Sequence, residues 1–262
     1  LPLFQTIGYS FTDYNGINPK KEFTGLTNYF DVFQDKWFYN SMAFTGKSVL
    51  LMILLANVLG FLLALALNTK IRSRNILRAI VFCPFVFNNV TVGFIWQFLL
   101  GRFMTDLYPL TGWNVFNIGW LSDNSLVLYS VVFVKLWQSI GYFMVIYLAG
   151  LQLLPQDPLE AAVIDGCTGI KMIRYITIPL MKPTAFVCIF LAITESLNMF
   201  PLIMSLTNGG PGHASENISL YIYNEAFKSH RMGYASALAV ILTIIMTIIA
   251  GLQMKLTRED AG

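Results

Sequence analysis

The sequence predicts an all-α protein, a polytopic bundle of helices that crosses a membrane several times. Of its 262 residues, 56% are hydrophobic and 12% are charged, and the mean hydropathy is +0.61. A soluble domain carries about 25% charged residues. Half of that charge density, together with several long apolar runs, indicates a membrane protein. The net charge of +3 is small and gives no reason to expect a nucleic-acid partner.

Five apolar segments are long enough to cross a bilayer, which takes about 20 helical residues. They are residues 44–67, 79–100, 126–154, 183–206 and 233–256. The chain also opens with a shorter apolar run, residues 1–11, which lacks the basic start of a signal peptide. We interpret this run as the end of a first span. The expectation is then about six spans in a single transmembrane domain, residues 1–262.

Basic residues predict which side of the membrane each loop occupies, because cytoplasmic loops carry an excess of lysine and arginine. The loop 68–78, the connection 155–182 and the C-terminus lie on one side if the spans alternate. These three places hold Lys70, Arg72, Arg74, Arg78, Lys171, Arg174, Lys182, Lys255 and Arg258. The bias predicts that the connection 155–182 and the C-terminus are cytoplasmic.

Cysteine and histidine are sparse and scattered. Cys83, Cys167 and Cys188 form no C-x-x-C pair, and His213 and His230 are far apart. This pattern favours neither a zinc site nor a disulfide framework, and we expect no metal on this chain.

Two features inside the spans concern helix packing. Ala56, Gly60 and Ala64 form a small-xxx-small pattern that allows close approach of another helix. Pro84, within the second of the five segments, lacks an N–H and is expected to kink its helix. Asn88 and Asn89 follow one turn later, and their amides need polar partners. Hydrogen bonds between helices and a water-filled cavity both remain open explanations.

Lys135 lies well inside segment 126–154, where a charge costs about 2.5–3.5 kcal/mol or more. Gln138 and Tyr142 follow at i+3 and i+7, so all three share one helix face. Glu195 and Asn198, at i and i+3, are expected to form a similar face on the next span.

Lys135 and Glu195 have opposite signs, and we hypothesise that they approach each other or line one cavity. A buried ion pair that only fixes packing is the alternative. The amide and aromatic side chains around them would suit a polyol substrate, but ordinary polar contacts between helices have the same composition.

The connection 155–182 carries signals for two short helices. Asp157 is expected to be an N-cap, with Pro158 at the first helical position. Glu160 is placed in the first turn, where the helix dipole favours an acid. Gly166 is a suitable C-terminal breaker.

The second helix of this connection is expected over residues 170–178, with Pro179 as its stop. Such a pair of helices can dock in a groove on a partner. The alternative is an interfacial helix that lies on lipid, although a strong basic face is missing.

These residues resemble a known family. Glu160-Ala161-Ala162, Asp165-Gly166 and Ile178-Pro179-Leu180 resemble the "EAA" loop of ATP-binding-cassette (ABC) importer permeases. Further along, Thr207-Asn208-Gly209-Gly210-Pro211 resembles the "TxGGP" motif of sugar-type permeases. The resemblance covers nearly the whole chain and is closest to the carbohydrate-uptake (maltose and multiple-sugar) branch.

The resemblance implies a type I ABC importer permease fold and a role as half of the membrane pathway for a sugar or oligosaccharide. It implies a second permease subunit, a different chain, and two cytoplasmic ATPase subunits that bind ATP and Mg. An extracytoplasmic solute-binding protein would deliver the substrate, and the location would be a bacterial or archaeal cell (inner) membrane. It assigns ATPase coupling to Glu160, Ala161, Ala162, Asp165, Gly166 and Pro179. The external loop after Thr207 is a candidate contact for the binding protein through Asn208, Gly209, Gly210 and Pro211, and an unspecialised loop is the alternative.

The chain itself has no ATPase motif, so we expect it to be no enzyme and to bind no cofactor. Gly46-Lys47-Ser48 resembles the end of a P-loop, but Ser41 stands where that motif needs its first glycine. The tripeptide also opens a spanning helix instead of following a strand.

Other functions remain as alternatives. An ion-driven secondary transporter would show inverted repeats and broken helices. Two further alternatives are a permease for a non-sugar solute, such as a glycerol phosphate, and a membrane scaffold without transport activity. A scaffold would have no need of Lys135 and Glu195.

Overall fold

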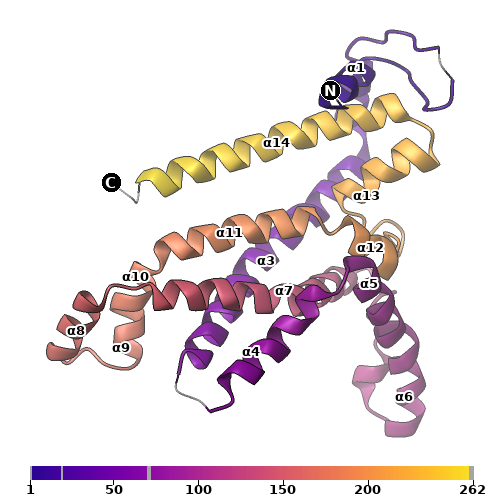
Figure 1. The fold of residues 1–262 in the computed structure, drawn as a ribbon. Coiled ribbons are helices and arrows are strands. Elements are labelled where there is room, and N and C mark those ends of the chain that lie inside the picture. The colour runs from indigo at the N-terminus through magenta and orange to yellow at the C-terminus, as the bar shows by residue number, and fades with distance from the viewer. Residues whose placement is uncertain (1, 19, 70–71, 260–262) are drawn as a thin grey trace. The chain divides into compact units, whose positions relative to one another are not determined.

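The computed structural model describes residues 2–18, 20–69 and 72–259. Among these residues, the pairing of extended segments is limited to one bridge between Thr12 and Phe23. The all-α prediction is therefore confirmed, and Figure 1 shows the succession of helices. Leu1 of the expected first span and Lys70 of the charge count lie outside the described residues.

The chain forms two compact units, each assembled from separate stretches of sequence. The first unit comprises Leu1–Ser48, Asn89–Val134 and Ser196–Leu252. The second comprises Val49–Asn88, Lys135–Glu195 and Gln253–Gly262.

Three long helices match three of the predicted spans. They are α3 (Lys36–Leu67), α7 (Val127–Gln152) and α14 (Met232–Glu259). Within the described residues, three helices are long and apolar enough to cross a membrane, and up to five spans result if each of two bent helix pairs counts as one. The shorter α1 (Pro2–Ser10) covers the expected end of a first span.

The expected span 79–100 is not one helix. It is divided into α4 (Arg74–Phe82), the 3₁₀ turn η1 (Cys83–Val86) and α5 (Asn89–Gln97), followed by the π-helix η2 (Phe98–Phe103) and α6 (Met104–Thr111). Pro84 explains the break, because a proline has no N–H to donate and its ring clashes with the carbonyl of residue i−4. The predicted kink is thus a complete interruption.

The expected span 183–206 is interrupted as well. α11 (Lys182–Leu197) ends before α12 (Phe200–Leu206) begins. Pro201 disfavours continuation because its ring would clash with the carbonyl of Leu197. The Ser219 hydroxyl donates a hydrogen bond of 3.3 Å to that carbonyl and so supplies a partner.

The first unit is built around an apolar cluster contributed by α2 (Thr27–Gln34), α3, α13 (Ile218–Tyr223) and α14. Its buried members are Val32, Phe38, Ile218, Tyr221, Tyr234, Ala237 and Leu238. α5 and α12 also pack closely, because a Cβ at Gly93 would clash with the Ser205 hydroxyl. The short 3₁₀ helix η3 (Asn114–Asn117) and the π-helix η5 (Asn224–Lys228) complete the unit.

In the second unit, small residues bring α3 against α7. Ala56 and Ala64 are fully buried, and a Cβ added at Gly60 would lie 2.9 Å from Cβ of Phe143. The predicted small-xxx-small contact is confirmed. The Tyr147 hydroxyl also donates a hydrogen bond of 2.6 Å to Oδ1 of Asn57, which ties the same two helices together.

Candidate functional site

An ion pair joins α7 to α11 inside the second unit. Nζ of Lys135 lies 2.6 Å from Oε2 of Glu195, and the two side chains are 3% and 25% exposed. The predicted proximity of these two charges is confirmed. A charged lysine in a span is tolerated where a carboxylate partners it, because an isolated charge there is costly.

The lysine also belongs to a wider polar arrangement. Its Nζ lies 3.5 Å from Oε1 of Gln138, whose Nε2 donates a hydrogen bond of 2.9 Å to the carbonyl of Phe87. That carbonyl follows the 3₁₀ turn η1, where the proline has interrupted the helix. Gln138 therefore supplies a donor to backbone freed by the break. The ring of Tyr142 stacks on Phe85 in the same turn, with centroids 4.5 Å apart and planes 2° apart.

The three asparagines that the sequence singles out, Asn88, Asn89 and Asn198, lie at helix breaks. Asn88 is exposed in the segment between η1 and α5, and Asn89 is the half-buried first residue of α5. Asn198 is exposed in the turn between α11 and α12. The expectation that Asn198 shares a helix face with Glu195 is wrong, because α11 ends at Leu197.

The connection after α7 begins with α8 (Gln156–Ile164), for which Pro155, and not Asp157, is the N-cap residue. Asp157 instead lies in the first helical turn, where the helix dipole still favours it. The prediction that Gly166 ends this helix is confirmed. Its φ is +76°, and Cys167 N–H donates back to the Ala162 carbonyl at 2.8 Å, as in a helix ended by a left-handed residue.

The second half of this connection departs from the prediction. α9 (Ile170–Met172), the π-helix η4 (Ile173–Thr177) and α10 (Ile178–Leu180) follow one another without a gap. Pro179 therefore lies inside helical structure and is not its stop. It follows directly on the π-helix η4, and its missing N–H removes one backbone donor from this continuous helical run.

The surface of α8 and its surroundings combines exposed acids with exposed apolar side chains. Glu160, Ala161 and Asp165 are exposed, whereas Ala162 is buried. Ile164 is 86% exposed, and Val163, Ile170 and Tyr175 are also exposed. We call the exposed residues Glu160, Ala161, Val163, Ile164 and Asp165 the α8 surface. Figure 1 shows α8 and α9 beside each other beyond the end of α7.

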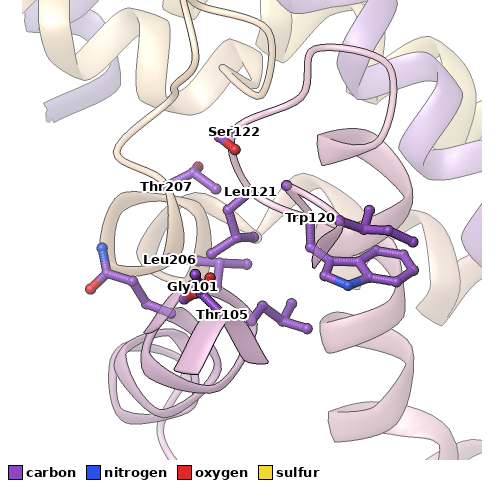
Figure 2. A pocket seen from close by; sticks show the side chains of 11 residues that line it. Gly101, Thr105, Trp120, Leu121, Ser122, Leu206 and Thr207 are labelled. Carbon is purple, nitrogen blue, oxygen red and sulfur yellow. The ribbon is translucent and has the colours of Figure 1, made fainter. Parts of the chain in front are cut away.

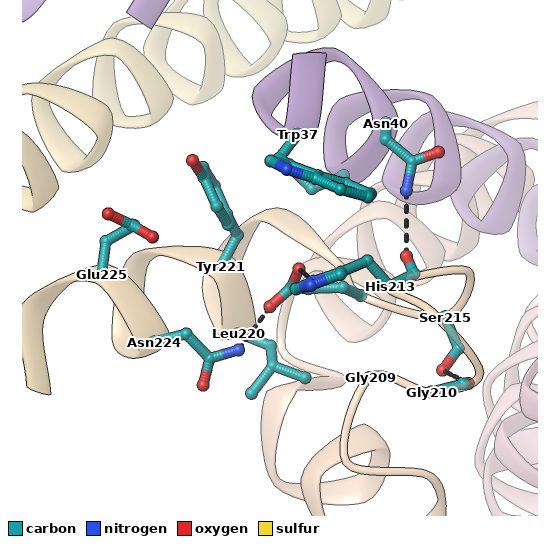
Figure 3. A network of polar contacts seen from close by, with 12 residues as sticks. Trp37, Asn40, Gly209, Gly210, His213, Ser215, Leu220, Tyr221, Asn224 and Glu225 are labelled. Carbon is teal, nitrogen blue, oxygen red and sulfur yellow. Dashed lines mark hydrogen bonds and ion pairs between the residues drawn. The ribbon is translucent and has the colours of Figure 1, made fainter. Parts of the chain in front are cut away.

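The glycine-rich loop after α12 is held by an internal network (Figure 3). The hydroxyls of Thr207 and Ser215 lie 2.8 Å apart, and Ser215 Oγ donates to the Gly210 carbonyl. Gly209 has φ +85° and is buried, and a Cβ there would lie 3.2 Å from Leu220. Its position in the left-handed region suits glycine, so this residue shapes the turn.

Of the remaining residues assigned to this contact, Asn208 is exposed, and Gly210 and Pro211 are half-buried. Further along the loop, Nδ1 of His213 lies 2.6 Å from Oε2 of Glu216, a carboxylate buried to 98% of its side chain. Oε1 of Glu216 accepts a hydrogen bond from Asn224. The loop is therefore an ordered element of the first unit. Sequence reasoning did not single out Glu216, because an acid in a predicted external loop is usually solvated.

A recess of about 330 Å³ lies between η2, α6 and the loop before α7 (Figure 2). Gln97, Thr105, Trp120, Ser122 and Thr207 contribute polar groups to its lining. Such a mixture of an amide, hydroxyls and an indole can bind an uncharged polar ligand.

A second carboxylate, Asp35, links the start of α3 to α13 and α14 in the first unit. Oδ2 of Asp35 accepts hydrogen bonds from the hydroxyls of Tyr221 and Tyr234, and Oδ1 accepts one of 2.8 Å from Trp37 N–H. Partial burial raises the pKa of Asp35, but these hydrogen bonds outweigh it and leave the pKa below its usual value. Burial, followed by the bond to Asp35, raises the pKa of Tyr221.

Comparison with known proteins decides the family. The model of the family described as "Binding-protein-dependent transport system inner membrane component" matches residues 56–258. The chain belongs to this family. As a transport component of the inner membrane, it is a permease and not an ATPase.

This transport component has relatives of similar length. A probable permease for starch degradation products from Thermoanaerobacterium thermosulfurigenes is 36% identical, over 99% of this chain and 88% of the relative. A multiple sugar-binding transport permease of Streptococcus mutans is 33% identical, over 98% and 89%. The sn-glycerol-3-phosphate permease of Brucella abortus is 30% identical, over 98% and 88%.

The transport component also shares its fold with a solved structure. A chain of a bacterial ABC transporter that imports the acidic polysaccharide alginate superposes with a TM-score of 0.82 at 21% identity. The match covers 98% of this chain and 89% of that one. The predicted ABC importer permease fold is thereby confirmed.

Proposed function

We propose that this chain forms half of the membrane pathway for a sugar or oligosaccharide in an ATP-driven importer. The relatives described as permeases for starch products and multiple sugars support this substrate class. The α8 surface carries the proposal, because it presents apolar and acidic groups on a short helix of a membrane component that has no nucleotide-binding motif of its own.

In this proposal the α8 surface faces the cytoplasm and docks on an ATPase subunit. The excess of basic residues near this connection supports the cytoplasmic orientation. The docking helix and its end are shaped by Glu160, Ala161, Ala162, Asp165 and Gly166. Ala162 is on the buried side of this helix. Pro179 lies in the second helical run of the connection. ATP and Mg bind in the two ATPase subunits, and their dimerisation moves the connection.

The free energy needed to open the pathway is modest. Shifting a pathway from mostly closed to mostly open takes about 5.5 kcal/mol of differential binding. A short helix ended by Gly166 transmits such a change as one body, because its backbone hydrogen bonds are complete at that end.

The substrate pathway in this proposal follows polar side chains of the unbroken helix α7, of α11 and of the breaks in two other spans. Lys135, Gln138, Tyr142 and Glu195 supply charges, an amide and a phenol in the second unit. Asn88, Asn89 and Asn198 lie at breaks between helices, where amides are accessible without disrupting a helix interior. Aromatic faces and hydrogen-bonding groups of this kind bind polyols.

On the external side, we assign the loop Asn208–Pro211 to the contact with a solute-binding protein. Asn208 offers the exposed side chain, and Gly209 and Gly210 set the shape of the turn. A second permease subunit, a different chain, completes the pathway.

A glycerol phosphate is a second candidate substrate. The glycerol-3-phosphate permeases of two Brucella species are 30% identical to this chain. Competition between labelled oligosaccharides and sn-glycerol-3-phosphate in one uptake assay separates the two classes.

The test is uptake by proteoliposomes that contain the chain with its copurifying subunits and binding protein. ATP enclosed with the ATPases should drive accumulation of labelled oligosaccharide, and a non-hydrolysable analogue should not. Uptake driven by an ion gradient without ATP would overturn the proposal in favour of a secondary transporter.

A further inference from the structure

A cationic cavity of about 560 Å³ lies in the first unit, between the beginnings of α3 and α7 and the loop around His213. Its lining includes Lys36, Trp37, Asn40, Lys47, Asn124 and Tyr129. None of the residues that line it is an aspartate or a glutamate. We propose that this cavity binds the headgroup of an anionic phospholipid.

The two lysines share one face of α3. Residues 36, 40, 43, 44 and 47 line the cavity, and these spacings recur on one side of a helix. Both lysines are exposed, and in the described part of the chain neither ammonium group has an ion-pair partner. Their positive charges therefore add within one cavity.

The neighbouring acids are occupied elsewhere. Asp35 accepts from Tyr221, Tyr234 and the Trp37 N–H. Asp123 accepts hydrogen bonds from the N–H and the hydroxyl of Ser125 at 2.7 and 2.6 Å. Neither carboxylate lines the cavity, so Lys36 and Lys47 are the charged residues of its lining.

The register of α3 places the cavity at the level of lipid headgroups. The run Ser48–Leu67 contains no charged residue and is about 30 Å long, the thickness of a hydrocarbon core. Lys47 stands at its edge, where a lysine can extend its ammonium group to the interface. Tyr129, in the first turn of α7, is 57% exposed, and Trp37 is exposed beside it in the lining. Tyrosine and tryptophan are enriched at this depth.

The wall of the cavity is fixed before any ligand binds. The ring of Trp37 lies 4.4 Å from that of His213, and Nδ2 of Asn40 donates a hydrogen bond of 2.9 Å to the His213 carbonyl (Figure 3). Gly212 and Ala214, on either side of His213, line the cavity. Lys47, at the hydrocarbon edge, can then bind the phosphate, Lys36 adds positive charge at the outer end of the cavity, and Asn124 hydrogen-bonds to headgroup hydroxyls.

An acidic surface of the solute-binding protein is the competing occupant. Lipid is favoured because the cavity extends from Lys36 to Lys47, about 16 Å along α3 to the hydrocarbon edge. Phe44 and Leu128 add apolar side chains to the lining. This inference needs the chain to lie in a membrane and does not depend on the transported substrate.

The experiment uses the complete transporter in nanodiscs of phosphatidylglycerol and phosphatidylcholine, with bound lipid counted by native mass spectrometry after mild stripping. The wild type should retain phosphatidylglycerol preferentially. The Lys36→Gln/Lys47→Gln variant should lose about fivefold of that preference for each lysine. The Lys36→Arg/Lys47→Arg variant should keep the preference for phosphatidylglycerol. Lys228→Gln, which removes an exposed lysine outside the cavity, should also leave this preference unchanged.

Two results would overturn the inference. One is a wild type without preference for phosphatidylglycerol, which needs no variant to fold. The other is a double glutamine variant with unchanged lipid retention and weakened affinity for the binding protein, which assigns the lysines to that protein.

Discussion

Lys135 of α7 and Glu195 of α11 form an ion pair of 2.6 Å within the second unit, next to the proline-induced break that follows α4. Gln138 links this pair to the carbonyl of Phe87 at the break. The charges therefore stabilise a place where backbone hydrogen bonding is incomplete, and they lie among the polar groups that we assign to the pathway.

Removing one charge of the pair should destabilise the protein more than removing both charges. Lys135→Met leaves Glu195 without its ammonium partner and should cost about 3 kcal/mol of stability, at the low end for a buried pair because Glu195 is partly exposed. The Lys135→Met/Glu195→Met double variant should recover most of this loss. Thermal unfolding of the purified complex measures both.

The exchanged pair, Lys135→Glu/Glu195→Lys, is the companion variant. Recovery of assembly by the exchange supports the direct pairing, and an exchange that restores nothing lost in the single variants contradicts it. A double methionine variant that assembles but no longer transports would assign the pair to the pathway. Normal transport would assign it to packing alone.

The α8 surface should account for ATPase association. Ile164→Gln removes an apolar side chain that is 86% exposed, and Glu160→Lys reverses a charge in the same helix. Each should weaken association about tenfold or more, the effect of losing a central interface contact. Copurification of the ATPase subunits and substrate-stimulated ATP hydrolysis report the loss.

Leu110→Gln is the matched control for that experiment. This leucine is 81% exposed in α6, away from the α8 surface in the sequence and in a different unit. It should leave ATPase association unchanged. Normal association and normal coupled hydrolysis in both α8 variants would remove the coupling role from α8.

Acid should weaken the first unit through Asp35. Its pKa in the folded protein lies below the unfolded value of 3.8, so the ionised carboxylate stabilises the fold above that pH and this contribution is lost as the pH falls through the folded pKa. Asp35→Asn should cost about 1 kcal/mol near neutral pH. It should also flatten the decrease in unfolding temperature below about pH 4. An equally steep decrease in wild type and variant would show that other carboxylates cause it.

Gly141 should tolerate no side chain. A Cβ there would clash with the Val81 carbonyl and with backbone of Phe82, so Gly141→Ala should destabilise the second unit by about 1–3 kcal/mol. Gly46→Ala is the control, since nothing lies within 4 Å of its Cβ position and alanine favours a helix. Equal unfolding temperatures for the two variants would contradict the close approach of α4 to α7.

The sequence predicts the spans wherever an apolar run coincides with an unbroken helix, as in α3, α7 and α14. The sequence also predicts the ion pair between Lys135 and Glu195, because an isolated charge in a membrane span is costly without a partner of opposite charge. It does not reveal the end of α11 at Leu197, since the residues after Asn198 are as apolar as those before it and Pro201 acts through backbone sterics. Pro179 misleads in the opposite way: a proline predicts the end of a helix, but the helical run Ile170–Leu180 continues past it after the π-helix η4.

The exposure of Ile164 also lies beyond sequence reasoning. An apolar residue in a membrane protein is expected to face lipid or a core, and only the folded connection shows it exposed at the end of a short helix. The burial of Glu216 is similar, because its partners His213 and Asn224 meet it only after the loop has folded.

The most direct test of the coupling role is cross-linking from Ile164→Cys in a background with serine at positions 83, 167 and 188. In membrane vesicles with the complete transporter, a short bifunctional reagent should link this cysteine to an ATPase subunit, with an efficiency that changes when ATP is bound. A cysteine that links to no ATPase subunit and is modified by a membrane-impermeant reagent from the external side would contradict the account.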